Sequence, residues 1–144
     1  MRSRAFMPVL TMAAAAAMSF QVHAEGDLAR KCEKLDELVL GTDEAGFKVS
    51  KSEYALETGK CYKLEIASSG KQEYALRGPE FFRNIWIRKL EAGGMEIKAT
   101  HLYELEFEDE AEAELHFTPI RPGTYTLAAS GLEAKGTVIT FKVS

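Results

Sequence analysis

Three residues beside a pair of glycines carry side chains that bind metals. Met95 and Glu96 directly follow Gly93-Gly94, and His101 lies six residues after Met95. A thioether, a carboxylate and an imidazole together suit copper, and with further carboxylates they suit ferrous iron. The spacing matches no regular ligand motif, so the alternative is that Met95 caps an apolar edge and His101 ends a strand or lies on a loop.

A second set of candidate ligands surrounds His116. In an extended chain, Glu112, Glu114 and His116 share one face, because side chains alternate with a period of two. Pairing with another strand could bring Glu104 or Glu106 beside them. Carboxylates with one imidazole suit a hard or borderline cation. The alternative is a solvated sheet face on which like charges lie side by side.

Glu80 is the third candidate, in the segment GPEFF. Its carboxylate equally suits the start of a short helix, where the helix dipole favours a negative charge. The chain has no nucleophile motif and no glycine-rich phosphate loop. Whether it is an enzyme therefore stays open at this point.

The elements that must position these residues are short strands. Turn signals such as Glu57-Thr58-Gly59 and Pro122-Gly123 separate runs that alternate apolar and polar residues: KVSKSEYAL, CYKLEIA, YELEF, AELHFTP, TYTLAA and TVITFKV. This pattern predicts an all-β, antiparallel sandwich. Pro79 at the start of PEFFR predicts one short helical turn. The stretch GDLARKCEKLDELVL begins with mildly helical character and becomes strand-like at residues 38–40.

The N-terminal residues have the pattern of a secretory signal. Arg2 and Arg4 precede an apolar run, and Val22-His23-Ala24 places small residues where a signal peptidase cleaves. We therefore expect residues 1–24 to be removed and residues 25–144 to form one exported domain. Two of the 18 basic residues lie in the signal, whereas all 22 acidic residues follow it. The acidic mature chain disfavours nucleic acid as a partner, and it has no second apolar run for membrane insertion.

Export also decides how the two cysteines are interpreted. Cys32 and Cys61 are the only cysteines in the sequence. Oxidising compartments favour a bridge between such a pair. The sequence therefore predicts a Cys32–Cys61 disulfide, with metal binding by one thiolate as the alternative.

From about Phe47 to Val143 the chain resembles the cupredoxin family. The resemblance rests on ALETGKCYKLEI, GPEFFRNIWIRKLEAGGMEIKA, AELHFTPIRPGTYTLAAS and GTVITFKV. More narrowly, PEFF followed by EIKA is similar to small periplasmic cupredoxin-like proteins that accompany bacterial iron- and copper-handling systems. The resemblance implies a Greek-key β-sandwich in the periplasm. Family members that carry blue copper use a Cys, a His and usually a Met in the final loop, and a first His earlier in the chain.

The matching segments of this chain, LAASGLEAKG and SSGKQEYAL, contain none of these ligands. We therefore expect no type 1 copper. The resemblance implies copper or iron at a non-blue site and a role as an accessory of metal uptake, ferrous iron oxidation included. The partner would be an inner-membrane metal permease or another periplasmic protein. The alternative is a cupredoxin-like module without metal that is structural or binds a partner, as a homodimer for instance.

Overall fold

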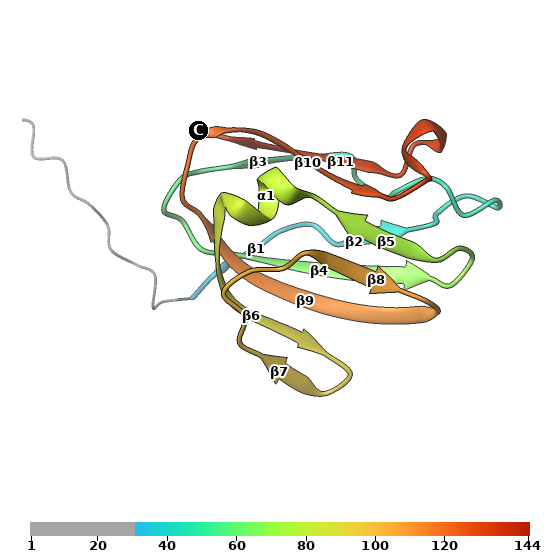
Figure 1. Cartoon of the computed structure of the whole chain (residues 1–144), viewed down its shortest axis with the longest axis horizontal. Helices are drawn as coiled ribbons and strands as arrows, with labels where there is room; N and C mark the ends of the chain where they lie inside the picture. Colours follow the sequence, from blue (N-terminus) through green and yellow to red (C-terminus); the bar gives the residue numbers. More distant parts are fainter. Residues whose placement is uncertain (1–30) are drawn as a thin grey trace, which may run out of the picture.

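Two sheets pack face to face in the computed structural model, which describes residues 31–144 (Figure 1). The predicted signal, residues 1–24, lies outside the described residues. The first sheet, sheet A, has the strand order β1, β4, β9, β6, β7, and β2 also pairs with β4. Its strands are β1 (Glu33–Lys34), β2 (Leu38–Leu40), β4 (Tyr62–Ser69), β6 (Ile85–Ala92), β7 (Met95–Ile97) and β9 (Glu110–Pro119).

The second sheet, sheet B, has the strand order β3, β11, β10, β5, β8. Its strands are β3 (Glu53–Leu56), β5 (Tyr74–Arg77), β8 (Glu104–Phe107), β10 (Gly123–Ala129) and β11 (Val138–Val143). A 3-10 turn, η1 (Glu133–Lys135), lies between the last two strands. The chain crosses repeatedly between the sheets, and the β6–β7 hairpin projects beyond the sandwich (Figure 1).

The all-β sandwich expected from the sequence is confirmed, and its sheets are mixed. Most neighbouring strands are antiparallel, but β1 and β2 run parallel to β4, and β3 runs parallel to β11. Alternation of apolar and polar residues defines which face of a strand is buried and carries no information about strand direction. The parallel pairs were therefore not readable from the sequence.

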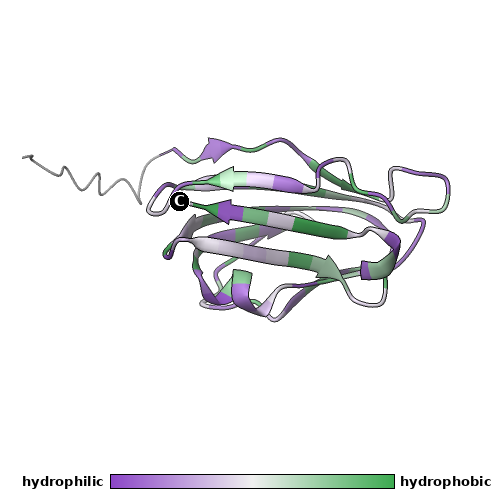
Figure 2. Cartoon of the chain, turned by 90° about the horizontal axis from the view of Figure 1, so that it is seen from above, coloured by the Kyte–Doolittle hydropathy of each residue, from purple (hydrophilic) through white to green (hydrophobic). Residues whose placement is uncertain are grey.

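The core lies between the sheets and follows the period-two pattern. On β9, Ala113, Leu115 and Phe117 point inward, and on β4 Leu64 and Ile66 do so, with relative exposures of 8% or less. The residues between them point to solvent. Figure 2 shows the result as alternating hydrophobic and hydrophilic bands along the strands. This alternation places the polar residues of β4 and β9 together on the outer face of sheet A.

The predicted helical turn is confirmed as α1 (Pro79–Arg83), with proline in its first turn. Phe81 and Phe82 from this turn are buried in the core. The ring of Phe81 stacks on Phe141 of β11 with 4.1 Å between the ring centroids, and it meets Phe117 of β9 edge-on. One short turn thus joins the two sheets through an aromatic cluster.

The N-terminal stretch is extended where the structure describes it. The expected helical character is wrong for residues 31–37, since Glu33 and Lys34 form β1 alongside β4. The predicted disulfide between Cys32 and Cys61 is present. This bond and the β1–β4 hydrogen bonds fix the segment to the sheet edge, which overrides its weak local helix preference. Within residues 31–144 no helix is long and apolar enough to cross a membrane.

Candidate metal site

Two neighbouring strands of sheet A place two glutamates and a histidine side by side on the outer face. In the strand register, Glu91 of β6 is opposite Glu114 of β9, and His116 of β9 is opposite Lys89 of β6. On the other side of β9, Lys63 and Glu65 of β4 are opposite His116 and Glu114, respectively. The outer face therefore carries one row of basic and imidazole groups next to one row of carboxylates.

A β-bulge in β6 creates this alignment. Ile87 is opposite Phe117 and Lys89 is opposite His116, so the register skips Arg88. Before the bulge, Ile87 points into the core; after it, Leu90 does so and Glu91 points outward. In an uninterrupted strand Ile87 and Leu90 would lie on opposite faces. The extra residue thus turns Lys89 and Glu91 toward β9's histidine and glutamate.

Glu91, Glu114 and His116 form what we call the carboxylate–histidine cluster. One ligand atom from each lies within 4.8 Å of the other two. His116 Nε2 hydrogen-bonds Glu114 Oε1 and lies 3.8 Å from Glu91 Oε2. The side chains of His116, Glu114 and Glu91 are 12%, 20% and 41% exposed, respectively. The cluster is therefore half-enclosed by the sheet and open to solvent on the Glu91 side.

Two lysines hold the carboxylates of the cluster. Lys63 Nζ lies 2.5 Å from Glu114 Oε2, and Lys89 Nζ lies 2.7 Å from Glu91 Oε1. Directly opposed carboxylates repel each other, and these ammonium groups offset the repulsion. The ion pairs continue in both directions, so that a charge ladder crosses five strands. Its members, in order, are Lys34, Glu65, Lys63, Glu114, His116, Glu91, Lys89, Glu96 and Lys98.

The ladder changes the ionisation of its central carboxylate. Partial burial raises the pKa of Glu114. Hydrogen bonds with Lys63 and His116 lower it by more, so that the net result is a pKa of about 2. The pKa of Glu96 is also lowered, chiefly by its hydrogen bonds with Lys98 and Lys89. Glu114 is thus a carboxylate anion at any physiological pH, which is the form that binds a cation.

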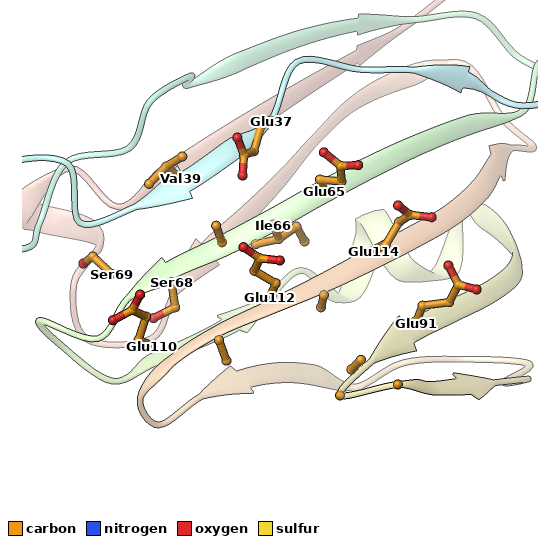
Figure 3. Close-up of a pocket in the computed structure, with 16 residues that line it drawn as sticks. Glu37, Val39, Glu65, Ile66, Ser68, Ser69, Glu91, Glu110, Glu112 and Glu114 are labelled. Atoms are coloured by element: carbon orange, nitrogen blue, oxygen red, sulfur yellow. The ribbon is translucent and has the colours of Figure 1, made fainter.

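The cluster lies at one end of a wide acidic groove, with a volume of about 1020 Å³, over β2, β4, β6 and β9 (Figure 3). Six glutamates line it: Glu37, Glu65, Glu91, Glu110, Glu112 and Glu114. Figure 3 shows that the labelled carboxylates come from neighbouring strands. In the described part of the chain no basic side chain pairs with Glu37, Glu110 or Glu112. The groove therefore has a negative potential that attracts cations.

Met95, Glu96 and His101, the first predicted ligand set, lie apart in the structure. Met95 and Glu96 are neighbours on β7, so their side chains leave opposite faces of the strand. Glu96 is opposite Glu91 and joins the charge ladder, whereas Met95 is 62% exposed on the other face. His101 is exposed in the loop after β7. These three residues do not converge on one ion.

The other predicted site residues, Glu80 and His116, lie in different parts of the fold. Glu80 lies exposed in the first turn of α1, the helix-start position that the sequence left open, and its carboxylate lies 3.4 Å from Arg83. His116 is a member of the cluster. Its strand pairs with β4 and β6, while Glu104 and Glu106 lie on β8 in the other sheet. The expectation that these two glutamates could lie beside His116 is wrong, and Glu91 takes that place.

A hydrophobic corner adjoins the cluster on the same face. Trp86 is 45% exposed and is opposite Thr118, which is 1% exposed. The hydroxyl Oγ1 of Thr118 has no hydrogen-bond partner among residues 31–144. The Cys32–Cys61 disulfide lies nearby, with Cys32 Sγ 3.6 Å from Arg88 Nη1.

The loop before β11, where the resemblance expects copper ligands, is engaged in structural contacts. Thr137 Oγ1 donates to the carbonyl of Phe47 at 2.6 Å, and Lys135 Nζ lies over the Phe47 ring at 4.2 Å from its centroid. Tyr74 Oη donates to the carbonyl of Gly46 at 2.7 Å in the same region. Both cysteines of the sequence are in the disulfide, so neither offers a thiolate. The contacts at this end of the sandwich are thus structural ones, and the absence of type 1 copper stays a prediction.

Comparison with known proteins identifies the fold. No family model and no curated protein matches the chain. Among solved structures, the copper nitrite reductase of Nitrosomonas europaea matches with a TM-score of 0.60 and 10% identity, over 84% of this chain and 52% of the other. The chain has a cupredoxin fold. At these identities the likeness shows the fold alone.

Two further solved structures give the same result. The McoA multicopper oxidase of Aquifex aeolicus has a TM-score of 0.61 and 11% identity, over 78% of this chain and 29% of the other. The copper-containing nitrite reductase of Thermus scotoductus has a TM-score of 0.56 and 12% identity, over 82% and 32%. This cupredoxin-like chain thus spans between about a third and a half of the copper proteins that it matches.

Proposed function

We propose that this cupredoxin-like chain is a metal-handling protein that binds copper or ferrous iron at the carboxylate–histidine cluster. One observation carries the proposal: Glu91, Glu114 and His116 place three ligand atoms within 4.8 Å of one another. Two carboxylate oxygens and one imidazole nitrogen form a donor set for first-row divalent metals. The acidic groove around the cluster favours the approach of a cation.

The biological setting of the proposal comes from the sequence. An exported domain with a signal at residues 1–24 would act in the periplasm. There it would serve metal uptake, by supplying an inner-membrane permease or by assisting ferrous iron oxidation. The exposed Trp86 beside the cluster provides apolar surface of the kind that docks a partner. Fold likeness to copper proteins supports a copper-related role and leaves the metal to be determined by experiment.

The experiment is a thermal-unfolding titration of residues 25–144 with Co²⁺ as an air-stable mimic of ferrous iron, and with Cu²⁺. Binding to the native state raises the free energy of unfolding by about 2.7 kcal/mol at a hundredfold excess over Kd, and Tm rises with it. His116→Ala and Glu114→Gln should each abolish the shift. Glu112→Gln removes a carboxylate from the same face of the same strand and should retain it, as should His101→Ala.

A second function is favoured by the ion pairs themselves. Lys63 and Lys89 already neutralise the two carboxylates of the cluster without any ion. We infer that a metal-free module would use the same ladder as a structural network and bind a partner through the Trp86 corner. This alternative predicts no Tm shift with either metal. It also predicts that Trp86→Ala lowers affinity for a partner and leaves the fold intact.

A further inference from the structure

Each lysine that holds the cluster is shared with a glutamate outside it. Lys63 Nζ lies 2.5 Å from Glu114 and 3.4 Å from Glu65. Lys89 Nζ lies 2.7 Å from Glu91 and 3.4 Å from Glu96. Each ammonium group therefore has a second carboxylate within reach. Rotation of the lysine side chain would bring its ammonium group closer to the second glutamate.

The arrangement is the same on both sides of the cluster. Glu65 and Glu114 are directly opposed across β4 and β9, and Glu91 and Glu96 are directly opposed across β6 and β7. In each pair one carboxylate belongs to the cluster and the other lies beyond it, with a lysine between them. Lysine is a flexible point charge with three donors, so moving between two such acceptors distorts no backbone.

We propose that Lys63 and Lys89 are resident counter-ions, which a divalent cation displaces onto Glu65 and Glu96. This inference rests on the proposed function and names the class of ion: a divalent metal in preference to copper(I). Two ammonium charges leave the cluster and one ion of charge two replaces them, so the cluster keeps its charge balance. A monovalent ion would leave one carboxylate without a counter-charge.

The donor chemistry points the same way. Copper(I) prefers soft sulfur ligands, whereas the cluster offers two carboxylate oxygens and an imidazole nitrogen. The nearby sulfur atoms are those of the disulfide and of Met95, which lies on the opposite face of β7 from Glu96. Glu37, Glu110 and Glu112 line the groove and have no basic partner among residues 31–144, so they keep the surroundings negative after the exchange.

The test measures Co²⁺ affinity by isothermal titration calorimetry in wild type and matched variants. Lys63→Met and Lys89→Met remove the competing ammonium and should each tighten binding about two- to fivefold, the range of exposed ion pairs. Lys142→Met is the control, because Lys142 pairs with Glu53 on sheet B and its loss changes the net charge equally. It should change the affinity less than either cluster variant.

A double-mutant cycle separates exchange from a general charge effect. Glu96→Gln removes the second acceptor of Lys89 and should weaken Co²⁺ binding by a similar factor of about two to five. In the Lys89→Met background the same substitution should have little effect, because no ammonium remains to be relocated. A general field effect would instead weaken binding equally in both backgrounds.

Competition with a chromophoric copper(I) chelator under anaerobic conditions tests the choice of ion. Wild type should bind Co²⁺ or Cu²⁺ and should fail to take copper(I) from the chelator. If copper(I) binds at the cluster as tightly as the divalent ions, or if the lysine variants match Lys142→Met, the exchange proposal is overturned while metal binding stands. If no protein in the series binds any metal, both proposals fall.

Discussion

Glu91 and Glu114 face each other directly across β6 and β9, and each is held by a different lysine. His116 joins them by hydrogen-bonding Glu114. Two like charges at opposed sheet positions destabilise a sheet unless counter-charges are supplied. The stability of this face therefore depends on ionisation, and the dependence can be measured.

Acid should weaken the fold through Glu114. Its folded pKa of about 2 lies below the ordinary glutamate value of 4.5, so its ionic contacts contribute stability above about pH 4.5 that is lost as pH falls toward 2. Between pH 5 and pH 2, the free energy of unfolding should fall by about 1–3 kcal/mol less in Glu114→Gln than in wild type. Urea unfolding at a series of pH values gives the comparison.

The control for the acid experiment is Glu112→Gln. It removes one charge from the neighbouring outward position on β9, where no basic residue of the described chain is paired with the carboxylate. Its stability should follow the wild-type pH profile. A Glu114→Gln profile parallel to that of wild type would show that the ion pairs of Glu114 add nothing to stability.

Loss of the disulfide should be costly because it anchors the N-terminal strand. Cys32 and Cys61 close a loop with a sequence separation of 29, for which the chain-entropy relation gives about 3–4 kcal/mol. We expect the Cys32→Ala/Cys61→Ala variant to lose about this much free energy of unfolding. Reducing agent should lower the wild-type urea midpoint and leave that of the variant unchanged; equal midpoints for the oxidised wild type and the variant would contradict the prediction.

Truncation of Phe81 should open a cavity between the sheets. Its ring is fully buried and stacks on Phe141. Phe81→Ala should therefore cost about 3–5 kcal/mol in free energy of unfolding, from lost burial and the remaining void. Trp86→Ala is the aromatic control, since Trp86 is 45% exposed and should cost far less. Similar losses for both would show that α1 does not join the sheets.

Thr118 offers a stabilising substitution. Its buried hydroxyl has no hydrogen-bond partner among residues 31–144, and desolvating such a group costs about 1–3 kcal/mol. Thr118→Val keeps the shape and removes the polar atom, so stability should rise by about 1 kcal/mol. Thr126→Val, at an exposed position of β10, should change it by less than about 0.5 kcal/mol. A loss of stability in Thr118→Val would reveal a partner for the hydroxyl.

Most of the fold was predictable because it depends on alternation and turns. The runs that became β4, β9, β10 and β11 alternate cleanly, and Pro79 indicated α1. The disulfide followed from the expectation of export and a single pair of cysteines. Strand direction was not predictable, because a strand buries the same face whichever way it runs.

Two of the three cluster residues were predictable. Glu114 and His116 share one face of an alternating run, so their proximity follows from the sequence. Glu91 was missed because β6 does not alternate: the bulge at Arg88 interrupts the pattern in IWIRKLEA. Which strand lies next to β9 depends on the topology of the sheet, and a local sequence pattern does not predict it. The position of Glu91 therefore had to come from the structure.

The bulge at Arg88 makes chain length a determinant of this site. No residue of β9 is opposite Arg88, so a chain without it would keep Lys89 opposite His116, Leu90 in the core and Glu91 opposite Glu114. A chain that kept Arg88 and paired it with β9 as a regular strand residue would instead bury Glu91 and expel Leu90 to the surface. Homologues with a gap at Arg88 would therefore retain the cluster, whereas an insertion or deletion between Lys89 and Glu91 would reverse the face on which the glutamate lies.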